Sequence, residues 1–445
     1  MEKYQQYVNS GFEWIGDIPV QWNNLRLRFV CEFRNGYTPS KANPEFWEDG
    51  TIPWYRMEDI RDSGRKLEEA KQYVTKDAIK GGGLFEAGSF ILATTATIGE
   101  HAVLIVDSLA NQQFTNLKIR KSLSNRLLRD YFFYYLFVID DYCKATTKTS
   151  TFPAVSMELL KNCHVVFPLV QEQQAIVDYL DKKCSEIDNV ISAQQKRIAL
   201  LQELKQSVIT HAVTKGLNPN VEMKDSGVEW IGKVPKHWEI YKIKNCCKSE
   251  QYSIKTGPFG TQLKGEDLQP QGDVAVYSQQ NVINNDFTKI RYFVSFKKAE
   301  TLKGFYTKPD DVLVTSRGTI GKAAILSPSF PIGILHPCLI ALRLNQKICQ
   351  NDWLVMYVNE TDCFKTDVYL SSNATTIDVI YTGTLKNIYI PIPPYEEQIE
   401  ILKSIKEKCA SIDSSISKAQ YQVELLQEYK QSLITEVVTG KRKVS

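Results

Sequence analysis

The chain carries two copies of one unit within its 445 residues. Residues 10–22 read SGFEWIGDIPVQW, and residues 226–238, which lie 216 positions later, read SGVEWIGKVPKHW. A second pair repeats at an offset of 225: LLQELKQSVITHAVT at 200–214 and LLQEYKQSLITEVVT at 425–439. A repeat of this length predicts two similar domains in one chain, a covalent pseudo-dimer. Such a chain suits a target that itself has two separated halves.

Shorter landmarks recur between these ends at an offset of 222. TTATIGEHAVL (94–104) matches SRGTIGKAAIL (316–326), and DYFFYYL (130–136) matches DWLVMYV (352–358). The first pair predicts strand, turn and strand, because β-branched runs flank a polar loop that contains glycine. The second pair is typical of short amphipathic helices. We therefore expect two globular domains of mixed α/β class, at 22–165 and 238–388. The other segments would be an opening segment at 1–21, a long helix at 166–216, a linker with the repeated opening motif at 217–237, and a second long helix at 389–445.

Apolar residues recur at three- and four-residue spacing through 171–214 and 396–439, which is the pattern of a coiled-coil seam. The predicted seam residues are Leu180, Ile187, Ile191, Ile198, Leu201, Val208, Ile405, Ile412, Ile416, Val423, Leu426 and Leu433. A helix of this length spans roughly 65 Å, which is too long for one small domain to cover. Two such seams in one chain most economically bury each other. The alternative is that each helix packs on its own domain.

Bulk properties exclude several classes of protein. The net charge is only +3, so any nucleic-acid surface must be local. The 10 cysteines form no CxxC pair and no Cys/His cluster with zinc spacing. The N-terminus, MEKYQQYVNSG, lacks the apolar core of a signal peptide, and no apolar run is long enough to span a membrane. These features predict the reducing cytoplasm as the compartment.

The sequence shows no catalytic centre. Ile392-Pro393-Pro394-Tyr395 resembles the Asn/Asp-Pro-Pro-Tyr motif of amino-methyltransferases, but Ile392 cannot hold a target amine. This segment is better interpreted as a strand-to-helix junction. No GxxxxGK[ST] loop is present, and the five histidines lie in five unrelated contexts. We predict neither a catalytic residue nor a metal site.

The two predicted domains diverge, whereas the opening motifs and the helices stay similar. This contrast predicts a common frame that carries two different readers. Polar loops rich in Thr, Ser, Lys, Arg, Asn and Gln suit contacts to phosphates and base edges. In the first domain the candidate DNA-binding residues are Tyr37, Thr38, Pro39, Ser40, Lys41, Tyr55, Arg56, Thr94, Thr95, Thr97, Gln112, Gln113, Lys148, Thr149, Ser150 and Thr151. In the second they are Lys255, Thr256, Gln262, Ser278, Gln279, Gln280, Asn281, Arg317, Thr319, Lys322, Ser371, Ser372 and Asn373. For any single residue a solvated loop is the simpler alternative. The aromatic run 131–135 fits a core better than a base-stacking platform.

The pattern resembles the specificity subunit of a type I restriction-modification system. The motifs that carry the resemblance are WIG…W at the start of each unit, TIG in each domain, and LLQE-x-KQS at the end of each long helix. It covers essentially the whole chain. The resemblance implies two target recognition domains, each reading half of a split double-stranded DNA sequence, and two antiparallel helices that set the gap. It also implies docking of two modification subunits, which methylate adenine with S-adenosylmethionine. Restriction subunits, which use ATP and Mg, would complete the assembly, so this subunit needs no cofactor.

Two other readings stay open at this point. One is an enzyme, a DNA adenine methyltransferase or a nuclease with an unrecognised catalytic site. The other is a coiled-coil scaffold that has no affinity for DNA. Cofactor binding by the isolated chain would favour the first, and a DNA complex that weakens with salt would exclude the second.

Overall fold

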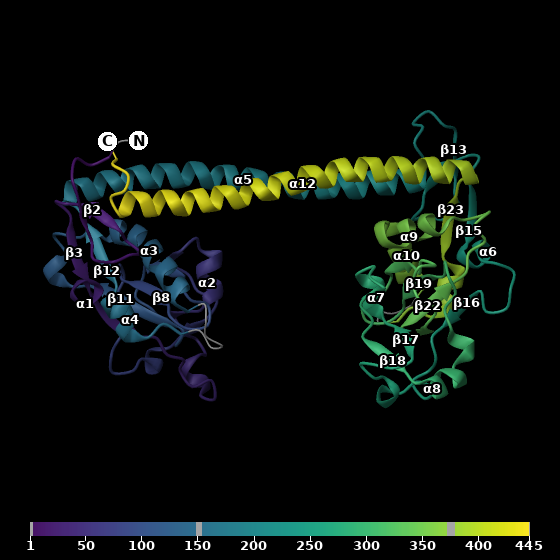
Figure 1. The fold of residues 1–445 in the computed structure, drawn as a ribbon, viewed down its shortest axis with the longest axis horizontal. Coiled ribbons are helices and arrows are strands. Elements are labelled where there is room, and N and C mark those ends of the chain that lie inside the picture. Colours follow the sequence, from purple (N-terminus) through teal and green to yellow (C-terminus); the bar gives the residue numbers. More distant parts are fainter. Residues whose placement is uncertain (1–2, 148–153, 372–378, 445) are drawn as a thin grey trace. The chain divides into compact units, whose positions relative to one another are not determined.

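The computed structural model describes residues 3–147, 154–371 and 379–444 (Figure 1). The chain forms two compact units: unit 1 comprises 1–195 with 421–445, and unit 2 comprises 196–420. Both borders fall inside long helices, α5 (Val170–Lys215, 46 residues) and α12 (Tyr395–Val438, 44 residues). The two long helices predicted from the apolar repeat are therefore confirmed, and each of them contributes to both units.

Unit 1 is a mixed α/β domain built on a five-stranded sheet. Its strand order is β4-β11-β8-β9-β6, and smaller sheets have the orders β10-β5-β7, β12-β3 and β1-β2. The strands are β1 (Tyr7–Asn9), β2 (Asp17–Pro19), β3 (Asn23–Arg26), β4 (Cys31–Asn35), β5 (Ile52–Tyr55), β6 (Lys66–Leu67), β7 (Tyr73–Val74), β8 (Phe90–Ala93), β9 (His101–Leu104), β10 (Leu109–Ala110), β11 (Phe114–Ile119) and β12 (His164–Phe167). The shorter helices are α1 (Leu27–Val30), α2 (Met57–Asp62), α3 (Arg129–Thr147) and α4 (Met157–Asn162).

Unit 2 repeats this topology with one difference. Its sheets have the orders β16-β22-β19-β20, β18-β17-β21, β15-β23 and β13-β14, so the described chain contains no counterpart of β6. The strands are β13 (Met223–Asp225), β14 (Lys233–Pro235), β15 (Glu239–Lys242), β16 (Ile254–Thr256), β17 (Val274–Tyr277), β18 (Tyr292–Val294), β19 (Val312–Thr315), β20 (Ala323–Ile325), β21 (Ile334–Leu335), β22 (Leu339–Leu342) and β23 (Tyr389–Ile392). The helices are α6 (Ile243–Cys246), α7 (Gln279–Ile283), α8 (Phe296–Thr301), α9 (Asn351–Glu360), α10 (Asp362–Ser371) and α11 (Thr382–Asn387).

The repeated landmarks form the centre of each unit. The TIG segments are the β8–β9 and β19–β20 hairpins, and every residue of β8 and β19 is buried. The aromatic run lies in α3, where Tyr131, Phe132 and Tyr135 belong to the same apolar cluster as Phe90 of β8. The structure thus confirms the strand–turn–strand prediction and the assignment of the aromatic run to the core.

The long helices pair antiparallel within each unit. In unit 1 the first half of α5 meets the last part of α12, and Lys430 Nζ lies 2.7 Å from Asp188. In unit 2 the equivalent ion pair joins Lys205 to Asp413 at 2.8 Å. All twelve predicted seam residues are buried or half-buried. In unit 1 the seam and the domain share one core, because Leu433 clusters with residues of both α5 and α3. Packing on the domain and helix–helix pairing therefore coexist.

A buried glutamine fixes the start of each long helix. Gln173 is fully buried; its side chain accepts from the Leu128 N–H at 2.8 Å and donates to the Arg126 and Pro168 carbonyls. Gln398 makes the same set of bonds in unit 2, accepting from Gln350 and donating to Ile348 and Pro393. Strand β23 ends at Ile392 and α12 begins at Tyr395, so the predicted strand-to-helix junction is confirmed.

Candidate nucleic-acid interface

Four loops meet at one site in unit 1. They are 36–41 after β4, 55–57 at the junction of β5 and α2, 94–99 between β8 and β9, and 111–113 between β10 and β11. Backbone bonds join them: Tyr37 N–H to the Ala110 carbonyl at 2.8 Å, Asn111 N–H to Tyr55 at 3.1 Å, and Thr94 N–H to Gln113 at 2.9 Å. These loops form one surface because their main chains hold one another in place.

The same four loops meet in unit 2. Gly257 N–H donates to the Leu339 carbonyl at 3.0 Å, His336 N–H donates to Tyr277 at 3.0 Å, and Ser316 N–H donates to Cys338 at 2.8 Å. We call these two sites the loop clusters. Loop cluster 1 consists of 36–41, 55–57, 94–99 and 111–113, and loop cluster 2 consists of 257–262, 277–280, 315–321 and 336–338.

One glycine in each loop cluster permits a backbone contact that the sequence does not reveal. A Cβ at Gly36 would lie 2.0 Å from the Asn111 carbonyl oxygen, and a Cβ at Gly257 would lie 2.2 Å from that of His336. Any side chain here would push the two loops apart. A comparison of the repeats at an offset of 221 aligns the two glycines, but only the three-dimensional contact shows what they do.

The TIG hairpins present different side chains on the same frame. Thr95 bridges Ala154 in unit 1 as Arg317 bridges Val379 in unit 2. The Thr94 carbonyl accepts from Val155 N–H at 2.8 Å, and the Ser316 carbonyl accepts from Ile380 N–H at 2.7 Å. The backbone at these positions is thus equivalent, whereas threonine is exchanged for arginine.

Arg317 is the most available basic group of loop cluster 2. Its side chain is exposed, and no carboxylate within the described ranges pairs with it. The neighbouring Gln279 fixes the loop by donating from Nε2 to the Thr319 carbonyl at 3.2 Å. By contrast, Arg56 in loop cluster 1 lies 3.0 Å from Glu58, so part of its charge is neutralised.

The predicted DNA-binding residues fall into three groups. Exposed or half-exposed are Tyr37, Thr38, Ser40, Lys41, Arg56, Thr95, Thr97, Gln112, Gln113, Thr256, Gln262, Gln279, Gln280, Arg317, Thr319, Lys322 and Ser371. Buried are Pro39, Tyr55, Thr94, Lys255, Ser278 and Asn281. Lys148, Thr149, Ser150, Thr151, Ser372 and Asn373 lie outside the described residues. Two surface pairs already bond each other, Thr38 to Gln112 and Thr256 to Thr382, both at 2.5 Å.

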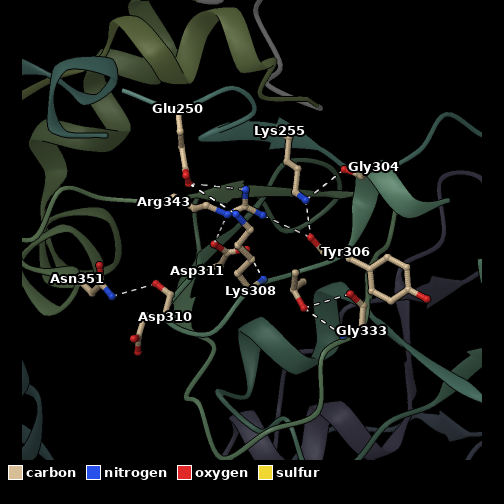
Figure 2. A network of polar contacts seen from close by, with 11 residues as sticks. Glu250, Lys255, Gly304, Tyr306, Lys308, Asp310, Asp311, Gly333, Arg343 and Asn351 are labelled. Carbon is tan, nitrogen blue, oxygen red and sulfur yellow. Dashed lines mark hydrogen bonds and ion pairs between the residues drawn. The ribbon is translucent and has the colours of Figure 1, made fainter. Parts of the chain in front are cut away.

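Lys255 illustrates why burial matters for this set (Figure 2). It is only 9% exposed, and its ammonium group donates to the carbonyls of Gly304 and Tyr306. Burial, together with the nearby Arg343, lowers the pKa of Lys255 to about 8. The Arg343 side chain itself donates to Asp311 at 2.9 Å. The Lys255 ammonium therefore secures the loop around 304–306 against β16, and it is not free to reach a phosphate.

One further exposed group, which the sequence did not single out, belongs to loop cluster 2. Phe259 is 73% exposed at a tip flanked by Pro258 and Gly260. Its position corresponds to that of Thr38, since each follows its glycine by two residues. Only the exposure, which the sequence does not reveal, distinguishes it from a core phenylalanine.

One titratable cluster of unit 1 lies in the buried core. His101 Nδ1 lies 2.7 Å from Asp140, which also accepts from Arg65 at 3.1 Å, but His101 is fully buried and burial lowers its pKa. Its Nε2 has no hydrogen-bond partner among the described residues. Within the same ranges no group of His, Cys, Asp and Glu side chains could hold a metal ion. The helices that the structure describes include none long and apolar enough to cross a membrane.

Comparisons with known proteins agree with the repeated architecture. The family model for the type I restriction modification DNA specificity domain matches residues 19–200 and 235–421. The Type I restriction enzyme MjaVIII specificity subunit of Methanocaldococcus jannaschii is 25% identical over 452 residues, which cover 96% of this chain and 94% of that protein. The EcoprrI specificity subunit of Escherichia coli is 41% identical over 172 residues, but the match spans only 37% of this chain and 42% of that subunit.

Solved structures show the same fold. A chain from a study of complex assembly and conformational transition of the type I R-M system has a TM-score of 0.66 at 16% identity, covering 95% of this chain and 98% of its own. The HsdS subunit from Thermoanaerobacter tengcongensis has a TM-score of 0.51 at 16% identity, with 96% and 98% covered. Nothing in these matches supports a methyltransferase or a nuclease. The chain belongs to the type I restriction modification DNA specificity family, and it is a specificity subunit that recognises DNA rather than a catalytic subunit.

Proposed function

We propose that loop clusters 1 and 2 each read one half of a bipartite DNA target, within recognition domains at 22–165 and 238–388. The observation that carries this proposal is the repetition of four interlocked loops on one frame with different side chains. Thr95 is replaced by Arg317, Arg56 by Ser278, and Thr38 by Phe259. Because sequence is read by side chains at base edges, equal frames with unequal side chains fit two unequal half-sites.

Arg317 is the proposed base reader of loop cluster 2. An arginine can donate two hydrogen bonds to O6 and N7 of guanine in the major groove, and no described carboxylate competes for this guanidinium. Six of the predicted residues are buried, so they support the loops from inside and are not proposed as DNA contacts: Pro39, Tyr55, Thr94, Lys255, Ser278 and Asn281.

The two long helices are proposed to set the spacing between the half-sites. Each of them is continuous, and each belongs to both units. A continuous helix is stiff, with a rise of about 1.5 Å per residue, so its length can act as a ruler. The ion pairs Lys205–Asp413 and Lys430–Asp188 fix the register of the helix pair within each unit.

Exposed apolar stripes on these helices support docking of two modification subunits. In unit 1, Tyr421, Leu425 and Tyr429 of α12 are 60%, 44% and 52% exposed at four-residue spacing. In unit 2, Leu200 and Leu204 of α5 occupy the positions equivalent to Leu425 and Tyr429 and are 64% and 49% exposed. Such a stripe fits the apolar face of a partner helix. Two equivalent stripes fit two copies of one modification subunit. These subunits would methylate the DNA with S-adenosylmethionine, and the complex would act in the cytoplasm. Restriction subunits, with ATP and Mg, would join that complex.

The test begins with mapping of methylated adenines in the source genome, which gives the two half-sites. Gel-shift titrations of the chain with its modification subunits then compare the intact duplex with duplexes in which one half-site is scrambled. The proposal predicts that each scrambled duplex binds more weakly, and that the affinity for the intact duplex falls steeply with salt. Equal affinity for the intact duplex and for one half-site alone would refute bipartite reading.

A further inference from the structure

The sheet of unit 2 ends in an open edge at β20. The register of β19 and β20 pairs Val312 with Ile325, and one residue beyond each strand the Leu326 N–H donates to the Asp311 carbonyl at 2.9 Å. Successive N–H groups of an extended chain alternate in direction, so those on either side of Leu326 point away from β19: Ile325, the last residue of β20, and Ser327, which lies two residues beyond the strand. Within the described ranges β20 is the last strand of its sheet, and no bond to the N–H of Ile325 or Ser327 is found on its open side.

Unit 1 shows what this position holds in the other repeat. There β6 lies beside β9 in parallel, and the N–H groups of Val103 and Ile105 donate to the carbonyls of Arg65 and Leu67 at 2.9 and 2.8 Å. Val103 and Ile105 are the counterparts of Ile325 and Ser327 at the offset of 222. An unpaired strand edge is a template for pairing with another extended segment.

The space beside the edge is hollow. A groove of about 490 Å³ runs along β20 between α7 and α9, within the size range of ligand sites. The segment after α7 covers part of the underlying core, because Phe287 is buried there, but it forms no strand against β20. Asn359 of α9 occupies only the first position of the edge, where its side-chain amide bonds both the N–H and the carbonyl of Ala323.

We propose that the β20 edge binds an extended segment of the modification subunit as an added parallel strand, with a basic residue facing α9. The segment would accept hydrogen bonds from Ile325 and Ser327, as β6 does from β9. This proposal rests on the proposed function, because it assumes that a modification subunit docks on the neighbouring helices.

Charge and continuity argue for this occupant. In unit 1, Arg65 reaches α3, where it bonds Asp140 and lies 4.7 Å from the Phe137 ring centre. In unit 2 the matching face of the groove carries two carboxylates, Asp352 and Glu360, against one ammonium group, that of Lys322. The excess of carboxylates suits a basic residue.

The same face of α9 leads toward the long helices. Asp352, Val355, Asn359 and Glu360 also line a second groove of about 650 Å³, which Lys205 of α5 and Leu402 of α12 complete. A subunit docked on these helices could thus extend a segment along α9 to β20. A second copy of this chain is a poorer occupant, because its own segment 65–67 is already paired with β9.

Strand binding at the β20 edge can be tested directly by adding a peptide to the full-length chain. The probe is a fluorescent peptide of residues 62–69, Asp-Ser-Gly-Arg-Lys-Leu-Glu-Glu, titrated by anisotropy. We expect saturable one-to-one binding, roughly tenfold weaker when the peptide carries Arg65→Glu, since a lost charged hydrogen bond is worth about 1.4 kcal/mol or more. The chain variant Glu360→Lys should bind the wild-type peptide more weakly and the Arg65→Glu peptide more tightly. Absence of saturable binding, or an equal loss for both peptides, would overturn the proposal.

Hydrogen exchange of backbone amides tests whether the modification subunit occupies the β20 edge. In the free chain, Val103 and Ile105 should exchange slowly and serve as the internal control, whereas Ile325 and Ser327 should exchange fast. Adding the modification subunit should slow exchange at Ile325 and Ser327. Slow exchange in the free chain, or fast exchange in a complex shown intact by size-exclusion chromatography, would overturn the proposal. If no complex forms, the proposed docking fails instead, and the peptide titration still decides whether the β20 edge binds a strand.

Discussion

Gly257→Ala should disable loop cluster 2 without unfolding the rest of the chain. The new Cβ would lie 2.2 Å from the His336 carbonyl oxygen and 2.6 Å from its carbon. Ordinary contacts begin near 3.4 Å, so the loop that starts at Gly257 must move by about 1 Å away from 336–338. Overpacking of this kind costs roughly 1–3 kcal/mol. For a unit of about 200 residues, each kcal/mol lowers the melting temperature by roughly 2–4 °C.

Gly260→Ala is the matched control, because no atom lies within 4 Å of its added Cβ in the same loop. Calorimetry should show a lower melting temperature for Gly257→Ala than for wild type, and an unchanged or slightly higher one for Gly260→Ala. Gel shifts should show that Gly257→Ala loses discrimination at the second half-site and keeps it at the first. If the two variants have the same melting temperature and discriminate equally at both half-sites, the close backbone contact does not organise loop cluster 2.

Three further predictions concern individual groups. Arg317→Ala should weaken binding to the intact target by roughly 1–3 kcal/mol and reduce the specificity at one base position. The control is Lys297→Ala, which removes an exposed lysine of α8 and should leave the affinity unchanged. Equal gel-shift affinities of the two variants would exclude Arg317 from the interface. Folding lowers the pKa of Lys255 from 10.5 to about 8. Between these pH values the unfolded chain therefore binds more protons than the folded chain, and the free energy of unfolding of the wild type rises with pH. Denaturant titrations should therefore show that the free energy of unfolding of Lys255→Met falls relative to that of wild type as the pH rises from about 8 to about 10. A difference in free energy that stays constant over this pH range would contradict the buried ammonium group. Inserting one heptad into 187–204 and into the matching stretch 412–429 should lengthen the gap by about 10 Å, or roughly three base pairs, as read by methylation mapping; an unchanged gap would exclude the ruler.

The sequence was sufficient for features that depend on local periodicity and on the repeat. The three- and four-residue spacing of apolar residues predicted α5 and α12 to within a residue or two, since such long seams have few alternative structures. The TIG hairpins followed from β-branched runs around a polar turn. The offset of 222 between the repeats also aligns Arg317 with Thr95, and the structure gives these two residues equivalent backbone bridges.

Features that depend on long-range contacts could not be predicted. Lys255 sits in a polar stretch that looks solvated, and only the carbonyls of Gly304 and Tyr306, far along the chain, show that its ammonium is buried. The contact of Gly257 with His336 likewise joins two loops distant in sequence. The absence of a β6 counterpart in the described part of unit 2 was hidden as well, because a two-residue strand leaves almost no periodic signal.

Exchange of one recognition domain tests the central claim most directly. Residues 22–165 would be replaced by the first domain of a family member with a different target, and methylated adenines would be mapped after expression with the modification subunits. Independent loop clusters predict a new first half-site, with the second half-site and the gap between them unchanged. A hybrid that altered both half-sites would contradict the account, because loop clusters 1 and 2 could not then be separate readers on a common frame.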